Sequence, residues 1–301
     1  MKNAKNAHFW QVDHKVKRIA EVKQVEVLSS PSAWEKYIWS RKYFRRKPEE
    51  GYFVWVRQQP NIPLQTCVNI VAKNIKQIMT NLLVVEEGLK IELEGFCGNV
   101  AACFNGAHLA QGSIYIKRNS SVTYRHIHSW EPDNIIEPNY EFLLEENAQL
   151  DYVYKTTHTP RILKVKNKIT CLKGAKVSIK ILVDCKNTEF FTEDAIVLKG
   201  KGSSGISRLR FIAGENSNIK AHSLIFAKSA SMGHLDCQSL ITADSAKVSL
   251  VPEVLCEEKE AQVTHEASIG KVSEEQLNYL RMRGLTEEQA LNLIISGFLR
   301  I

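Results

Sequence analysis

The chain has 301 residues, of which 44% are hydrophobic and 24% are charged, and its formal net charge is +7. This composition is typical of a globular protein with a sizeable core. No window approaches 18 uninterrupted apolar residues, and residues 1–8 lack the apolar core of a signal peptide, so the sequence predicts a cytoplasmic protein that does not enter the membrane.

The basic charge is concentrated at the N-terminus. Residues 1–48 hold 12 Lys and Arg against 4 Asp and Glu, whereas the rest of the chain holds 28 against 29. Between Arg41 and Lys47, basic residues are interleaved with Tyr43 and Phe44, a pattern that can bind nucleic acid through phosphate contacts and base stacking. No recognised nucleic-acid-binding motif accompanies the run, so we favour a solvated face or a surface that docks a protein partner.

The N-terminal elements are predicted to be mixed. Residues 8–48 have a mainly helical pattern, and the Ser-Ser-Pro segment at 29–31 is expected to form the N-cap and first turn of a helix that continues through Trp34. Residues 51–87 combine helical and strand patterns. We therefore expect residues 1–87 to form a basic, mixed α/β region.

From about residue 88 onward, the chain repeats a short strand-and-turn unit. Small or polar turn residues precede an apolar residue roughly every 13 to 16 residues, as in the segments 147–150 and 174–177. The segments between them, such as 177–183 and 207–212, alternate apolar and polar residues as half-buried strands do. Since one such unit cannot bury its apolar face alone, the repeat predicts a β-solenoid or a sandwich of short strands.

The C-terminal residues 271–301 are predicted to form a helical hairpin. Capping-box patterns begin at Ser273 and at Thr286, and Gly284 between them suits a left-handed helix C-cap. The second helix has one apolar face that must be buried, formed by Ala290, Leu291, Ile294, Ile295 and Phe298.

The cysteines and histidines include no complete metal or disulfide pattern. The seven cysteines, at positions 67, 97, 103, 171, 185, 237 and 256, contain no C-x-x-C pair, so we expect reduced thiols. His126 and His128 share one face of a strand, which suits a metal ion, but two ligands do not define a site. The glycine-rich segment 199–205 lacks the phosphate-loop pattern, so the chain should not hydrolyse ATP itself.

Three C-terminal segments carry a resemblance to a known family. They are residues 233–240, with a C-x-S-L pattern, residues 251–255, and residues 264–284, which start with a His-Glu-Ala triplet and lead into the hairpin. Over residues 230–298 the chain resembles the SufB/SufD family, the scaffold proteins of the Suf iron-sulfur cluster assembly machinery. The resemblance implies a β-helix core, here at residues 88–270, and it favours the solenoid over the sandwich.

The resemblance also implies a site at which an iron-sulfur cluster forms transiently, on a scaffold rather than an enzyme. The C-x-S-L segment of SufB carries its essential cysteine, which corresponds to Cys237, and the His-Glu pair corresponds to His265 and Glu266. Together these residues offer thiolate, imidazole and carboxylate ligands. We expect the pKa of Cys237 to be lowered by a nearby cation, either His265 or His234.

Several partners are implied in the same way. The family's C-terminal hairpin docks onto the ABC ATPase SufC, and the corresponding anchors here are Tyr279, Arg283 and Phe298. A sulfur donor and recipient apoproteins are also implied. SufB and SufD normally pair with each other, one supplying the cysteine and the other a histidine. Because this chain has both, we expect a homodimer in which Cys237 lies near the partner subunit's His265.

Two alternatives remain open. One is a purely structural, SufD-like partner without a cluster of its own, in which Cys237 is inert. The other is a β-helix carbohydrate hydrolase or lyase, which requires carboxylates that line a groove. The candidates for those carboxylates are Asp184, Glu189, Asp194 and Glu215.

Overall fold

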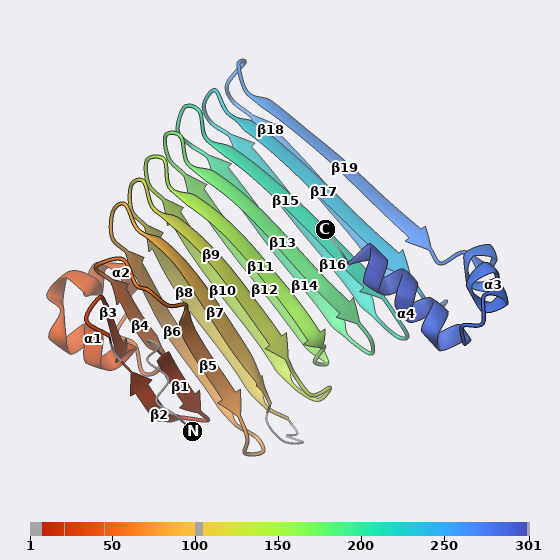
Figure 1. Ribbon diagram of the computed structural model, residues 1–301, viewed down its shortest axis with the longest axis horizontal. Helices are drawn as coiled ribbons and strands as arrows, with labels where there is room; N and C mark the ends of the chain where they lie inside the picture. Colours follow the sequence, from red (N-terminus) through yellow and green to blue (C-terminus); the bar gives the residue numbers. More distant parts are fainter. Residues whose placement is uncertain (1–7, 21, 45, 100–104, 300–301) are drawn as a thin grey trace.

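The strand-and-turn units wind into a flattened, parallel β-solenoid in the computed structural model, which describes residues 8–20, 22–44, 46–99 and 105–299 (Figure 1). Successive strands alternate between two facing sheets, so that each coil contributes one strand to each sheet. The fold class expected from the sequence, a mainly β solenoid with helices at both ends, is therefore confirmed.

Both sheets run from the N-terminal to the C-terminal end of the solenoid. The ten-stranded sheet contains, in spatial order, β2 (Lys15–Ala20), β1 (His8–Val12), β5 (Leu64–Ile70), β7 (Lys90–Asn99), β9 (Ser121–Ser129), β11 (Gln149–His158), β13 (Lys176–Cys185), β15 (Ser204–Ala213), β17 (Met232–Ile241) and β19 (Gln262–Lys271). The nine-stranded sheet contains β3 (Val25–Ser29), β4 (Tyr52–Val56), β6 (Lys76–Val85), β8 (Ala107–Ile116), β10 (Ile135–Leu144), β12 (Ile162–Cys171), β14 (Glu189–Leu198), β16 (Asn218–Ala227) and β18 (Lys247–Cys256).

The core lies between the two sheets. Alternate side chains of each strand point inward, as in β13, where Ile179, Ile181 and Val183 are fully buried. The parallel register then stacks equivalent positions of successive coils above one another, so that Ile181 pairs with Leu209, and Leu209 with Cys237. Inward-facing side chains of successive coils therefore form columns that run along the solenoid axis.

The turns explain the small polar residues of the repeat. Asn119, Asn147 and Gly174 occupy equivalent turns with φ of 59°, 56° and 65°. Asparagine and glycine tolerate this left-handed conformation better than other residues do. A Cβ atom at position 174 would lie 2.2 Å from the Asn147 side-chain oxygen, so this turn favours glycine.

The N-terminal end is closed by strands where helices were expected. Residues 8–29 form β1, β2 and β3, so the prediction of a mainly helical segment over 8–48 is wrong for this part. β1 and β2 form an antiparallel hairpin through Asp13, whose φ is 50°, and β1 and β3 extend the edges of the two sheets. Pairing with these edges outweighs the weak helical periodicity of the segment.

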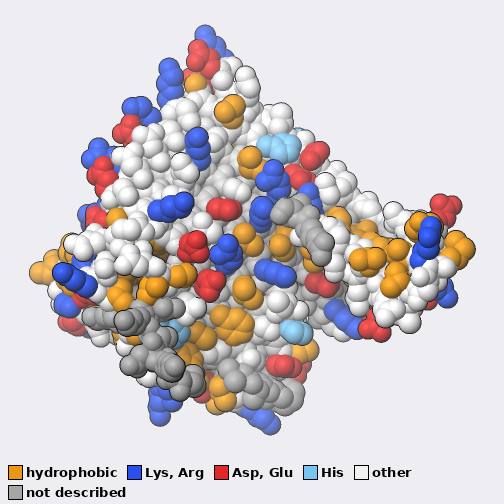
Figure 2. All heavy atoms as spheres, in the orientation of Figure 1, with side chains coloured by type: hydrophobic (Ala, Val, Ile, Leu, Met, Phe, Trp, Pro, Cys, Tyr) orange, Lys and Arg blue, Asp and Glu red, His pale blue; other side chains and the backbone are white. Residues whose placement is uncertain are grey.

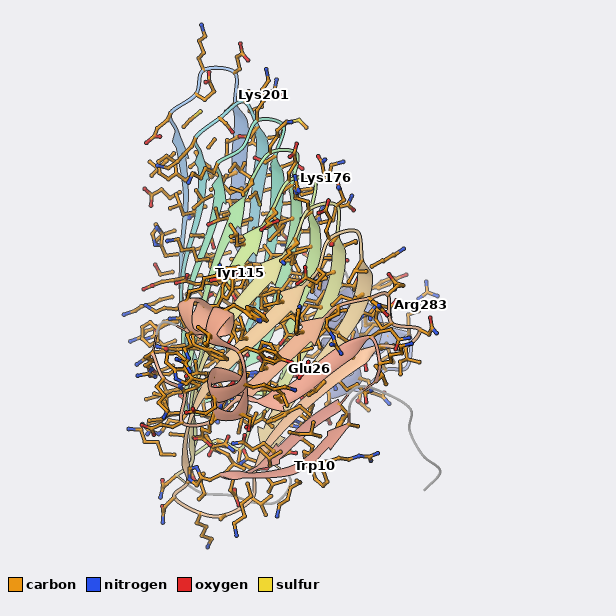
Figure 3. All side chains as sticks on the ribbon, turned by 90° about the vertical axis from the view of Figure 1, so that its left-hand side faces the viewer. Trp10, Glu26, Tyr115, Lys176, Lys201 and Arg283 are labelled. Carbon is orange, nitrogen blue, oxygen red and sulfur yellow. The ribbon has the colours of Figure 1, made fainter. Side chains whose placement is uncertain are left out.

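Helices follow as predicted from the Ser-Ser-Pro segment. α1 (Ser30–Lys36) has Ser29 as its N-cap and a proline in its first turn, and a 3-10 turn (Ile38–Ser40) and α2 (Arg41–Phe44) come next. These helices cover the outer face of the nine-stranded sheet, as Figures 1 and 3 show. The contacts are aromatic and include Trp34, Tyr37, Trp39, Tyr43, Phe53, Trp55 and Tyr115.

The stacked coils begin before residue 88, the boundary expected from the sequence. β5 and β6 already pair in parallel with β7 and β8. In β6, Leu82 and Val84 point outward into the aromatic cluster, whereas Leu83 and Val85 point into the core. Because both faces are covered there, residues 82–85 form a continuous apolar run without the alternation that marks the later strands.

The C-terminal hairpin projects from the other end of the solenoid and carries exposed hydrophobic side chains (Figures 1 and 2). Its helices are α3 (Glu274–Met282) and α4 (Glu287–Phe298). The capping box at Thr286 is present and Gly284 has a positive φ of 93°, as predicted. Ser273 is the N-cap of α3, but its side chain makes no capping hydrogen bond. No helix among the described residues has both the length and the apolar character of a membrane span.

Candidate functional site

Cys237 lies inside the solenoid, one strand away from its C-terminal end. Alternation along β17 turns Leu235, Cys237 and Ser239 inward, and Cys237 is only 2% exposed. In the ten-stranded sheet it stands between Leu209 of β15 and Ala267 of β19. The thiol is thus covered by a single further coil.

The surroundings of Cys237 favour its protonated thiol form over the thiolate. Burial raises its pKa to about 11, although the nearby Ser223 hydroxyl and the Arg210 guanidinium partly oppose this shift. The expectation of a lowered pKa is therefore wrong for the single chain. His234 does not face the thiol, because it lies on the outer side of β17, where its ring contacts Thr264 at 2.8 Å.

His265 and Glu266 point to opposite faces of β19, as neighbouring residues in a strand must. In register, His265 lies beside Leu235 and faces the interior side of the last coil, whereas Glu266 lies beside Asp236 on the outer side. Both side chains are exposed because no further coil covers β19. Within one chain, Cys237, His265 and Glu266 do not form a cluster of metal ligands among the described residues.

A buried ion pair lies directly behind Cys237. The guanidinium of Arg210 on β15 donates to the Asp236 carboxylate, with one N···O distance of 2.9 Å, and both side chains are less than a tenth exposed. The ring of Phe298 at the end of α4 lies 6.0 Å from this guanidinium. Phe298, predicted as an anchor for a partner protein, is therefore partly used to hold α4 against the solenoid. No sequence motif marks Arg210 or Asp236, because only the strand register brings them together.

Tyr279 and Arg283 remain available on the surface of α3. Tyr279 is 53% exposed, and the Arg283 guanidinium lies 5.2 Å from its ring and donates a hydrogen bond of 3.2 Å to its hydroxyl. Leu280 and Ile294 of the two helices line an open pocket beside this pair. An aromatic residue, an arginine and an apolar pocket are typical of a protein-binding surface.

The interior near Cys237 also contains an acidic group. Asp194 on β14 is 4% exposed and accepts hydrogen bonds from Asn167 at 2.6 Å and Thr192 at 2.5 Å. Burial raises its pKa from 3.8 to about 7, since the two hydrogen bonds compensate only partly for the lost hydration. Its charge in turn contributes to the raised pKa of Cys237.

This raised pKa predicts a pH-dependent stability. The folded state holds the Asp194 proton more tightly than the unfolded state, so the free energy of unfolding should fall as pH rises from about 4 to about 7. The free energy of unfolding of Asp194→Asn, relative to that of wild type, should therefore increase by on the order of 1 kcal/mol per pH unit across this range. Urea unfolding at several pH values measures the difference, and Glu189→Gln, at an exposed position of the same strand, is the control. Equal pH profiles for wild type and Asp194→Asn would contradict the prediction.

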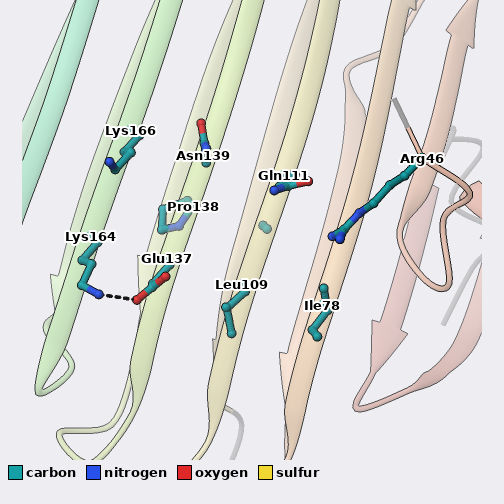
Figure 4. Close-up of a pocket in the computed structure, with 10 residues that line it drawn as sticks. Arg46, Ile78, Leu109, Gln111, Glu137, Pro138, Asn139, Lys164 and Lys166 are labelled. Carbon is teal, nitrogen blue, oxygen red and sulfur yellow. Dashed lines mark hydrogen bonds and ion pairs between the residues drawn. The ribbon is translucent and has the colours of Figure 1, made fainter. Parts of the chain in front are cut away.

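The four carboxylates considered for a carbohydrate-active enzyme do not share a groove. Asp194 lies in the core, whereas Asp184, Glu189 and Glu215 are exposed. A pocket of about 170 Å³ on the nine-stranded sheet contains none of the four (Figure 4). It lies beside Arg46 and is crossed by the ion pair of Lys164 with Glu137, at 2.7 Å.

The basic run at the N-terminus is largely engaged within the protein. The Arg41 guanidinium lies 5.6 Å from the Trp34 ring and donates to the Trp34 carbonyl oxygen, and Lys47 pairs with Glu35 at 3.1 Å. Arg45 lies outside the described residues. These contacts agree with a structural or docking role for this surface.

Comparison with known proteins places the chain among iron-sulfur assembly proteins. The sequence model of the family described as "SUF system FeS cluster assembly, SufBD core domain" matches residues 69–298, which extends well before the C-terminal signature. A protein of Methanothermobacter thermautotrophicus named "Iron-sulfur cluster assembly SufBD family protein" is 25% identical, with 91% of this chain and 73% of that protein aligned. A protein of the same name from Archaeoglobus fulgidus is 26% identical, with 100% and 86% aligned. A relative from Methanocaldococcus jannaschii is 28% identical, with 79% and 76% aligned.

Proposed function

Since this chain belongs to the SufBD family of iron-sulfur cluster assembly proteins, we propose that it is a scaffold on which a cluster is built and from which it is passed on. The observation that carries the proposal is the position of Cys237, a thiol that is turned into the core one strand from the open end of the solenoid. Thiolate is the protein ligand that iron-sulfur clusters favour. The nascent cluster is the cargo of the protein, and the chain itself is not a catalyst.

The rest of the ligand set is supplied by a second copy of the chain. The last strands, β18 and β19, form uncovered edges, and Val251, Leu255 and Ile269 on them are 52%, 41% and 48% exposed. Unpaired edges with exposed apolar side chains favour pairing with another chain. A two-fold axis at this end joins like surfaces and brings Cys237 of one protomer toward the partner subunit's His265.

The high pKa of Cys237 is compatible with iron binding in such a dimer. A metal ion displaces the thiol proton, so a ligand that is protonated in the single chain becomes a thiolate when iron arrives. His265 and Glu266 are exposed at the proposed interface, on the two sides of β19. His265 shares the interior side with Cys237 and offers the imidazole ligand, whereas the Glu266 carboxylate joins the set only when the edge strand β19 turns in the dimer.

A SufC-like ABC ATPase is the proposed partner of the C-terminal hairpin. Tyr279 and Arg283 form the docking surface, and α4 leads from it through Phe298 to Arg210 and Asp236 behind Cys237. Nucleotide-driven movement of the hairpin would thereby reach the strand that carries the thiol. A sulfur donor and recipient apoproteins complete the proposed set of partners.

The hairpin surface yields a binding prediction. Tyr279→Ala should weaken binding of the purified SufC-like ATPase of the same organism roughly 30-fold, because truncating an aromatic anchor costs on the order of 2 kcal/mol. Titration calorimetry measures the affinity. Ile38→Ala, at a residue that is 76% exposed at the opposite end of the solenoid, should leave the affinity unchanged. Equal loss in both variants, or none in either, would count against this docking surface.

The scaffold role itself is tested by anaerobic reconstitution. Purified chain is incubated with ferrous iron and sulfide, separated from free ions, and examined by absorption and Mössbauer spectroscopy before and after an apo-ferredoxin is added. A cluster that forms on the chain and then appears on the ferredoxin supports the scaffold. A chain that binds no cluster, alone or with the ATPase, would instead be a structural partner of the SufD kind.

A further inference from the structure

A second group of metal-binding side chains lies in the N-terminal half of the core. Cys97 of β7 and His126 and His128 of β9 place their ligand atoms within 4.8 Å of one another, and all three are buried. The Cys97 sulfur is 3.6 Å from Nε2 of His126, which is 2.9 Å from Nε2 of His128. The three ligand atoms therefore lie close together, and the two Nε2 atoms are within hydrogen-bonding distance of each other.

The strand register builds this group. Cys97 pairs directly with His128, and His126 pairs with Gly95. A Cβ atom at position 95 would lie 3.1 Å from the His126 ring and 3.0 Å from the Tyr124 hydroxyl, so the missing side chain makes room for the imidazole. Two neighbouring coils therefore supply all three ligands: one provides the thiol and the next provides both imidazoles.

Two of the three ligand-ligand distances are close to those of a tetrahedral zinc site, and the third, from the Cys97 sulfur to the His128 nitrogen, is at most 4.8 Å. Zinc bonds of about 2.3 Å to sulfur and about 2.0 to 2.1 Å to nitrogen place tetrahedral ligands about 3.6 Å apart for a sulfur-nitrogen pair and about 3.3 Å apart for two nitrogens. The observed sulfur-nitrogen distance agrees with the first value. The two imidazoles need to separate by only a few tenths of an ångström to reach the second.

The outer contacts orient both imidazoles for metal binding. Nδ1 of His126 lies 3.4 Å from the Tyr152 hydroxyl, and Nδ1 of His128 lies 3.0 Å from the Tyr154 hydroxyl. Such contacts at the far nitrogen leave Nε2 to bind a metal.

We propose that Cys97, His126 and His128 bind one transition metal ion of the zinc type, as a resident structural site that joins β7 to β9 inside the solenoid. Thiolate and imidazole are ligands typical of Zn²⁺. Binding releases the Cys97 proton and leaves one coordination position for a small ligand such as water. The site is separate from Cys237, since β11, β13 and β15 lie between β9 and β17, which places the two about 19 Å apart.

The metal content of the full chain tests the proposal. Protein is produced in zinc-supplemented medium, purified without chelators and analysed by elemental mass spectrometry and X-ray absorption. Wild type should carry about one zinc ion per chain, with one sulfur and two nitrogen ligands. Cys97→Ser and His126→Gln should reduce the metal content at least 10-fold. Cys171→Ser, which alters another fully buried thiol, and Cys237→Ala should keep the ion.

The outcomes separate this site from the proposed cluster site. Metal retained in Cys97→Ser but lost in Cys237→Ala would overturn the inference and leave the scaffold function standing. If the Cys97 and His126 variants do not fold, the Cys237→Ala chain refolded with Co²⁺ decides the question, because a thiolate-to-cobalt charge-transfer band requires a cysteine ligand and Cys237 is then absent. The absence of that band, or of bound metal in folded wild type, would also overturn it.

Discussion

Cys237→Ala is expected to abolish cluster assembly while the chain stays folded. Cys237 is the one inward-facing thiol on β17, and alanine leaves no sulfur with which to hold iron in the proposed site. Anaerobic reconstitution with iron and sulfide should therefore give the absorption and Mössbauer signals of a cluster with wild type and only background with the variant. The proposed role of His265 predicts the same loss for His265→Ala.

The control is a cysteine of similar burial without the proposed role. Cys185 of β13 is fully buried, so Cys185→Ala creates a comparable cavity but should keep the cluster. Mixing the Cys237→Ala and His265→Ala chains adds a test of the dimer. A mixed dimer retains one intact pair of Cys237 and the partner subunit's His265, so part of the signal should return. Normal cluster formation by folded Cys237→Ala would refute the site.

Asp236→Ala is expected to destabilise the chain by about 3 to 5 kcal/mol, because it leaves the Arg210 guanidinium buried without its partner. The loss should also loosen α4, since Phe298 packs over the same guanidinium. Urea unfolding measures the stability, and limited proteolysis of residues 273–298 reports on the hairpin.

A double substitution distinguishes an unpaired charge from a general packing defect. Replacing both partners, as in Arg210→Met with Asp236→Leu, removes the charges together and should recover most of the stability lost in Asp236→Ala. If the double variant is as unstable as the single one, the ion pair is not the source of the effect. If Asp236→Ala unfolds like wild type, the pair contributes little and cannot couple the hairpin to β17.

The sequence predicted the part of the fold in which each strand has one solvent-exposed face. From β7 onward, alternation and left-handed turn residues such as Asn147 and Gly174 recur with each unit, and the structure has strands there. β6 was missed because the aromatic helices cover its outer face and remove the alternation. Residues 8–29 were misassigned because the edges of distant strands, rather than local propensity, determine their conformation.

The candidate site was predictable only as far as sequence motifs extend. Cys237 and His265 stand in recognisable segments, but the alternation of β19, which separates His265 from Glu266, requires the register. Cys97 shows the same limit. It lies about one coil before His128 in the chain, and only knowledge of the exact coil length would have placed it beside the two histidines. The burial that raises the pKa of Cys237 is likewise a property of the assembled coils.

Local unfolding of the solenoid is expected to begin at its last coil. Each coil of a solenoid is held only by its neighbours, so unfolding begins at a free end. Antiparallel strands pair with the N-terminal edges of the sheets, whereas no described strand pairs with the outer edges of β18 and β19. Fraying of this one coil exposes Cys237, while Cys171 and Cys185 stay protected deeper inside. The Cys237 thiol can thus be reached through a local fluctuation that costs far less than global unfolding.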